Sequence, residues 1–208
     1  MIAPTQILCL WLVLAADPQL ETAAGHVARG MQRFRENDIA GSLRDFDRAA
    51  EMQPQRAPHL WQRGISHYYA GRFDEGRRQF EIHKAVNPHD VENATWHFVC
   101  VARQKGLDAA RRALIDIDTR RDTRVPMAEV YEFYADRATA DAVLKAAKTA
   151  GTERARMYAY LYLGLYFEVT DDPEQAARHM RQSAAAKLAD DYMHDVARIH
   201  LRQRDWQD

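Results

Sequence analysis

The chain contains few of the residues that interrupt helices. Nine glycines and seven prolines stand against 34 alanines in 208 residues. Gly and Pro destabilise helix interiors, whereas Ala, Leu, Arg and Glu favour them. The composition therefore predicts an all-α fold and argues against a disordered chain. The length suffices for one large domain, or two small ones, with a core of its own.

Cysteine is also scarce, and neither charge predominates. Two cysteines exclude a disulfide framework and a cysteine-based zinc module. Lysine and arginine number 29 and aspartate and glutamate 30, which gives a formal net charge of -1. Proteins dedicated to nucleic acids usually carry a basic excess on one face, so no nucleic-acid partner is expected. Cys100 lies in the apolar string FVCVA and is predicted to be a small buried hydrophobe.

The apolar run at the amino terminus is short. Residues 7–16 (ILCLWLVLAA) are apolar, but a transmembrane helix needs about 20 such residues. With Ala15 and Ala16 before Asp17, the run fits a secretory signal peptide over residues 1–16. The segment MIAPTQ lacks the usual Lys or Arg, which leaves a buried or interfacial first helix and a mis-assigned start as alternatives. Cys9 lies inside the run, so no lipid anchor or other stable membrane anchor is expected.

The chain contains an internal repeat. Gly30, Phe46 and Pro54 are separated by 16 and 8 residues, and Gly64, Phe80 and Pro88 repeat these separations 34 residues later. The segments 23–56 and 57–90 also agree in the phase of their apolar residues. A period of this length with these landmarks resembles the tetratricopeptide repeat, a pair of antiparallel helices. In this interpretation each glycine allows close helix approach, each phenylalanine fills the space between the helices, and each proline ends a unit.

The rest of the chain completes an expected solenoid of about ten helices in a single domain over residues 17–208. A degraded third unit, with Phe98 and Leu114 at the two landmark positions, is expected over 91–124. An irregular helical hairpin follows over 125–151. A fourth unit begins near Met157 and extends over 157–188, and a capping helix covers 190–204.

This order of elements resembles the NlpI-type tetratricopeptide proteins of bacterial envelopes. The residues that carry the resemblance are Glu132-Phe133-Tyr134 and the segment YLGLYF at 162–167. The resemblance implies an adaptor that holds other envelope proteins, without catalytic residues. It favours a secreted or periplasmic location, with the cytoplasm as the alternative. The missing lipoprotein cysteine is the main departure from that pattern.

The inner helix of each repeat predicts where a partner binds. In a tetratricopeptide array these helices line a concave groove, and aromatic residues with arginine at the rim suit an extended peptide or a helix. The alternative is that the irregular hairpin or the N-terminal segment covers the groove and uses these aromatics as core. The predicted groove residues are Met31, Phe34, Arg35, Trp61, Ile65, Tyr68, Tyr69 and Arg103.

No motif predicts catalysis, a metal or a cofactor. The chain has no nucleophile elbow, phosphate-binding loop or dinucleotide fingerprint. His83, His89 and His97 are expected on different elements as solvated or hydrogen-bonded side chains. Asp116, Asp118 and Asp122 lack the glycine and the terminal glutamate of a calcium loop, and nearby arginines can neutralise them. The expected function is non-catalytic binding of a protein or peptide. A self-association module that forms a homodimer is the alternative, and a metal-dependent enzyme is more remote.

Overall fold

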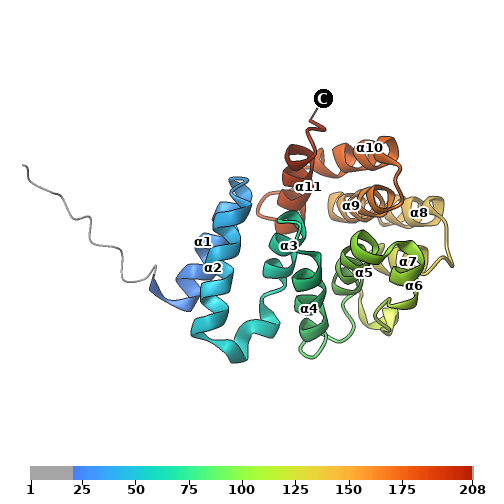
Figure 1. The fold of residues 1–208 in the computed structure, drawn as a ribbon. Helices are drawn as coiled ribbons and strands as arrows, with labels where there is room; N and C mark the ends of the chain where they lie inside the picture. Colours follow the sequence, from blue (N-terminus) through green and yellow to red (C-terminus); the bar gives the residue numbers. More distant parts are fainter. Residues whose placement is uncertain (1–20, 208) are drawn as a thin grey trace, which may run out of the picture.

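The computed structural model describes residues 21–207, and these residues are helical without any strand (Figure 1). The predicted all-α fold is confirmed for this part of the chain. The predicted signal peptide, residues 1–16, lies outside the described residues. Within the described residues, no helix combines the length and the apolar character that crossing a bilayer requires.

The helices pack as neighbours along the chain: α1 on α2, α3 on α4, and α9 on α10. Two 3-10 helices, η2 (Pro54–His59) and η3 (Thr119–Arg121), lie in the connections. The α-helices are α1 (Ala23–Arg35), α2 (Ile39–Met52), α3 (Trp61–Tyr69), α4 (Phe73–His83), α5 (Val91–Lys105), α6 (Leu107–Arg112), α7 (Met127–Tyr134), α8 (Ala140–Ala150), α9 (Glu153–Val169), α10 (Pro173–Ala184) and α11 (Tyr192–Gln203).

Short polar side chains determine where several helices begin. Asp38 accepts a hydrogen bond from the backbone N–H of Gly41 at 2.8 Å and thereby caps α2. Asp172 caps α10 in the same way, and Pro173 occupies its first turn, where the missing N–H costs nothing. Gly151 ends α8 with φ +66°, a conformation that glycine adopts without strain.

The glycines of the repeat touch the residues that lie 16 positions later. A Cβ added to Gly64 would lie 2.6 Å from Cζ of Phe80, and one added to Gly30 would lie 3.2 Å from the ring of Phe46. In the last pair, a Cβ on Gly164 would meet the Met180 methyl group at 2.9 Å. An added Cβ would therefore force a neighbouring side chain to move at Gly64 and Gly164, whereas at Gly30 it would make a tight contact.

Two expected boundaries differ from the structure. The second helix of the 91–124 unit, α6, ends at Arg112, so Leu114 lies beyond it. At the end of α6 the backbone N–H of Ala113 bonds the carbonyl oxygens of both Ala109 and Ala110. The helix expected to begin near Met157 begins at Glu153, because Thr152 caps it through the N–H of Ala155 and because both Ala155 and Met157 are buried.

The helix pairs follow one another around an arc, and α11 returns to the beginning of the chain (Figure 1). It packs on α10 and α9, and its other side meets α1. Arg35 at the end of α1 pairs with Asp195 of α11 at 2.7 Å. The arc of helix pairs is thus closed by α11, which joins α1 to α9 and α10.

Candidate binding pocket

The inner face of the first repeats is covered in this structure. Phe34 and Ile65 are 0% exposed and Tyr68 is 1% exposed. Tyr69 is buried too, whereas Met31, Arg35 and Trp61 are partly exposed and Arg103 is exposed beside the ring of Phe73. Four of the eight predicted groove residues therefore lie in the interior.

The covering element is α11. Tyr192 stacks on Phe34 with ring centroids 5.3 Å apart and meets Trp61 edge-on at 5.2 Å. Nδ1 of His200 lies 3.0 Å from the hydroxyl of Tyr69. The sequence suggested the irregular hairpin or the N-terminal segment as alternative covers. The structure instead uses the C-terminal helix, whose apolar residues at helical spacing are buried against this face.

A buried polar network holds α11 in place. Tyr68 donates a hydrogen bond to Oε2 of Glu168 on α9 at 2.6 Å, and Arg204 pairs with the other oxygen of the same carboxylate. Burial alone would raise the pKa of Glu168, but the charges of His200 and Arg204 outweigh it and lower the pKa. Because the Tyr68 hydroxyl and both carboxylate oxygens of Glu168 have partners inside the fold, we assign these contacts a structural role.

One cavity of about 200 Å³ remains between α3, α4, α5 and α11. It is smaller than the pockets of about 300–1,000 Å³ that usually hold drug-sized ligands. Its walls combine aromatic rings with a cluster of charged and amide side chains. The lining residues are Trp61, Phe80, His83, Asn87, Asp90, Glu92, Asn93, Trp96, Arg124 and Met193.

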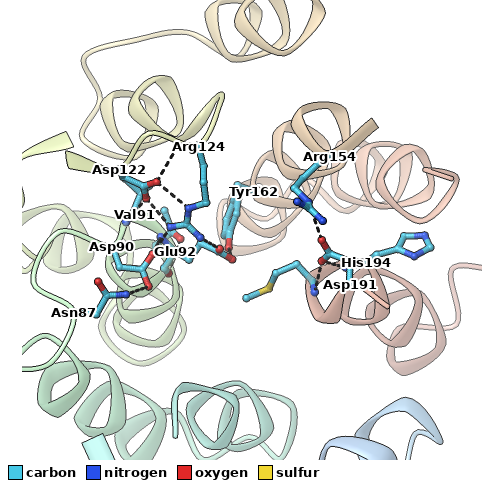
Figure 2. Close-up of polar contacts among 12 residues, drawn as sticks. Asn87, Asp90, Val91, Glu92, Asp122, Arg124, Arg154, Tyr162, Asp191 and His194 are labelled. Atoms are coloured by element: carbon cyan, nitrogen blue, oxygen red, sulfur yellow. Dashed lines mark hydrogen bonds and ion pairs between the residues drawn. The ribbon is translucent and has the colours of Figure 1, made fainter. Parts of the chain in front are cut away.

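The charged part of the lining is centred on Arg124 (Figure 2). Its guanidinium contacts the carboxylates of Asp90, Glu92 and Asp122. The hydroxyl of Tyr162 donates to the second oxygen of Glu92 at 2.6 Å. Asp90 also caps α5 through the N–H of Glu92, so the first turn of α5 positions two of the three acids.

The pKa values of Asp90 and Glu92, at the start of α5, are shifted in opposite directions. Desolvation raises the pKa of Glu92 to about 7, although Arg124 opposes the rise. Burial would also raise the pKa of Asp90, but His83 and Arg124 outweigh it and lower the pKa. Asp90 is therefore ionised at neutral pH, whereas Glu92 exchanges its proton there.

Three residues that line the cavity carry buried polar atoms without a hydrogen-bond partner among the described residues: Nε2 of His83, Oδ1 of Asn93 and Nε1 of Trp96. The side chains of these residues are at most 5% exposed. The other polar atoms of two of them are used: Nδ1 of His83 lies 2.7 Å from the carbonyl oxygen of Pro58, and Nδ2 of Asn93 donates to that of Phe80. Unpartnered polar atoms are uncommon in protein interiors, and three of the eleven such side-chain atoms among the described residues belong to the lining of this cavity.

Sequence reasoning anticipated only part of this site. It placed Trp61 at the binding surface, and Trp61 lines the cavity. It treated the Asp116–Arg124 segment as locally neutralised, and Arg120 does pair with Asp118 at 2.8 Å. Arg124, however, also reaches Asp90, which lies 34 residues earlier in the chain. The 34 residues between Asp90 and Arg124 equal one repeat length. This separation could have indicated their contact, since equivalent positions of successive repeats lie side by side.

His97 and Cys100 lie in the interior, whereas His89 is partly exposed. Nε2 of His97 lies 3.4 Å from Glu81, and Nδ1 of His89 accepts the N–H of Asp118 at 3.1 Å. Among residues 21–207, no three potential metal ligands come together. Cys100 is fully buried, and burial raises the pKa of its thiol, so it is not a thiolate nucleophile at neutral pH.

These features define the class as an all-α protein of neighbouring helix pairs with one small polar–aromatic cavity beside its closing helix. No protein-family model matches the chain, and no curated protein matches it. The functional argument therefore relies on the geometry of the cavity and of the helices around it.

Proposed function

We propose that the chain is a tetratricopeptide-type solenoid, similar to the NlpI-type envelope proteins, and that it acts as a non-catalytic module for binding a protein partner. The 34-residue repeat and the close contacts of Gly30 and Gly64 with their phenylalanines support this assignment of the fold. The closing position of α11 supports the binding role. The same inner face that holds an amphipathic helix in cis has the chemistry to recognise a peptide segment.

The observation that carries the proposal is the cavity beside Trp61. It is bounded on one side by α11, and three of its lining residues hold buried polar atoms without partners. Leaving such atoms without hydrogen-bond partners destabilises the empty site. A ligand that supplies the missing hydrogen bonds removes this penalty. The proposed contact is therefore a side chain of the partner that enters between Trp61 and Trp96.

The lining favours binding over catalysis. Glu92, with its pKa of about 7, is the residue suited to acid–base chemistry. Its carboxyl group is held by Arg124 and by the Tyr162 hydroxyl. None of the ten lining residues is a Ser, Thr, Cys or Lys that could act as a nucleophile. We assign the cluster to ligand recognition on these grounds.

The proposed place of action is the cell envelope. The apolar run at residues 7–16 and the resemblance of the repeats support export. Sequencing the amino terminus of the protein purified from its source tests this assignment. A mature chain that begins near Asp17 supports it, whereas an intact Met1 contradicts it.

The binding role is tested with a random-peptide library displayed on phage. Peptides selected against the full chain are titrated against the wild type and against Trp61→Ala, with Ile82→Ala as a matched control. Ile82 is a large apolar residue on the adjacent helix that is 42% exposed and does not line the cavity. We expect Trp61→Ala to weaken binding at least tenfold, as removal of an aromatic anchor usually does, and Ile82→Ala to leave it unchanged.

Two outcomes contradict the proposal. One is that the selected peptides bind the folded Trp61→Ala protein as tightly as the wild type. The other is that the library yields no binders while sedimentation equilibrium shows a tight homodimer. That result favours the self-association module instead.

A further inference from the structure

We propose that the cavity between α3, α4, α5 and α11 accepts the cationic end of a lysine or arginine side chain from the protein partner. This inference rests on the proposed binding function and adds the chemistry of the ligand. It is carried by the charge of the lining, by the type of the unpartnered atoms and by the shape of the walls.

The charged cluster at the cavity has an excess of negative charge, to which Asp122 contributes although it does not itself line the cavity. Asp90, Glu92 and Asp122 face a single guanidinium, that of Arg124. When Glu92 is protonated, the two aspartates still outnumber the arginine. Nη2 of Arg124 donates to Oδ1 of Asp90 and to Oδ2 of Asp122, whereas Oδ2 of Asp90 accepts from the amide of Asn87 at 3.1 Å. A second cation therefore lowers the electrostatic energy of the cluster, and an anion raises it.

The unpartnered atoms include an acceptor that no described residue satisfies. Nδ1 of His83 lies 2.7 Å from the carbonyl oxygen of Pro58 and donates to it, whereas Nε2 has no hydrogen-bond partner. The amide nitrogen of Asn93 is also used as a donor, so its free Oδ1 is an acceptor. Nε2 of His83 and Oδ2 of Asp90 are 3.7 Å apart, too far to bond each other. An ammonium or guanidinium group carries several N–H donors and can satisfy such acceptors together.

The walls suit the aliphatic part of the same side chain. Phe80 and Trp96 stack with centroids 6.4 Å apart and an interplanar angle of 20°, and Trp61 stands at the opening together with Met193 of α11. Aromatic faces attract cations and pack well against methylene groups. The volume of about 200 Å³ fits one side chain better than a cofactor. Nε1 of Trp96 is a free donor and can bond a backbone carbonyl oxygen of the ligand.

The test uses capped amino acids as probes of the full chain. N-acetyl-lysine methylamide and its arginine counterpart are titrated while the indole N–H resonance of Trp96 is followed by NMR. The norleucine counterpart has a similar length without charge, and the glutamate counterpart carries the opposite charge. We expect the basic probes to shift the resonance and to bind about tenfold more tightly than norleucine, since a hydrogen-bonded charge contributes more than 1.4 kcal/mol.

Asp90→Asn is the decisive variant. Asparagine is as good an N-cap as aspartate, so α5 keeps its start while the cavity loses one charge. We expect this variant to lose the preference for the basic probes. Asp141→Asn, at an exposed site on α8, is the control and keeps the preference. Equal binding of lysine and norleucine, or an unchanged preference in folded Asp90→Asn, overturns the inference.

Two further comparisons complete the test. One distinguishes a free amine from a side chain of a protein as the source of the cation. The other distinguishes failure of the cationic ligand from failure of the binding function as a whole. n-Butylammonium that binds as tightly as a library-selected peptide points to a free amine and contradicts a protein-borne side chain. Selected peptides that need Trp61 but tolerate replacement of every Lys and Arg overturn the cationic ligand and leave the binding function standing. A basic probe that displaces the selected peptides supports both.

Discussion

Gly64 shows at the residue scale why the repeat keeps its spacing. Exposed Gly→Ala changes in helices stabilise by about 1 kcal/mol because alanine has the higher helix propensity. A Cβ on Gly64 would lie 2.6 Å from Cζ and 2.8 Å from Cε1 of Phe80. We therefore expect Gly64→Ala to destabilise the protein by about 1–3 kcal/mol through overpacking, measured by urea denaturation.

Gly30→Ala is the matched comparison for this prediction. Its added Cβ would lie 3.2 Å from the ring of Phe46, a tight contact that a small ring displacement relieves. We expect a smaller loss than at Gly64. An unchanged or increased midpoint for Gly64→Ala would show that α3 and α4 can separate without cost.

Glu92 is expected to give the stability of the protein a distinct pH dependence. Burial raises its pKa to about 7 from 4.5, so between these values the folded protein holds a proton that the unfolded chain releases. The stabilising effect is complete below pH 4.5 and is lost as the pH rises through 7. We expect the wild type to lose about 2–3 kcal/mol relative to Glu92→Gln between pH 5 and 8, measured by urea denaturation across this range.

The comparison with Glu92→Gln isolates this proton from other titrating groups. Glu92 faces Arg124, Asp90, Asp122 and Tyr162, and all four remain in the variant. Parallel stability curves for the two proteins between pH 5 and 8 contradict the prediction. They would mean that Arg124 keeps Glu92 ionised throughout this range.

How well the sequence predicts a contact between two residues depends on how many residues separate them along the chain. The contact of Gly64 with Phe80 follows from helical spacing and a short turn. The contact of Arg124 with Glu92 spans 32 residues and crosses from a connector to the start of α5. Its geometry depends on where α6 ends and how the connector returns, and no local pattern gives either. The aromatic side of the pocket was therefore predictable and its charged side was not.

At the scale of elements, α11 is the informative helix. Its apolar residues recur at helical spacing, so the sequence predicts a helix with one buried face. The periodicity does not say which surface covers that face, because the inner side of the repeats and the end of the array are equally apolar partners. The structure places Tyr192 between Phe34 and Trp61, so α11 covers the predicted groove.

Tyr192 allows the docking of α11 to be measured. We expect Tyr192→Ala to cost about 2–4 kcal/mol, since it removes a buried aromatic ring from the interface. Its hydroxyl is buried without a partner among the described residues. Tyr192→Phe removes only that group, and we expect it to be neutral or stabilising by up to about 1 kcal/mol. Chemical denaturation of both variants checks this, and equal losses for the two would contradict the packing shown here.

For the whole molecule, the return of α11 changes how stability is distributed. In an open solenoid each repeat contacts only its neighbours, so the ends fray independently. Here Arg35 and Asn37, beside the first helix, bond Asp195 and Gln203 of α11. α11 also packs on α9 and α10. The first and last helix pairs therefore share one element, and we expect them to open together.

Native-state hydrogen exchange tests this coupling. In the double variant Arg35→Ala/Gln203→Ala, we expect the opening free energy of amides in α1 to fall by about 1 kcal/mol, the sum of two partly exposed polar contacts. The amides of α9 and α10 should keep their protection because their mutual packing is intact. Arg48→Ala is the control, since it removes an ion pair with Glu51 within α2, away from α11. If α1 exchanges as slowly in the double variant as in Arg48→Ala, the polar contacts do not couple the ends, and the stacking of Tyr192 on Phe34 alone holds the closing helix.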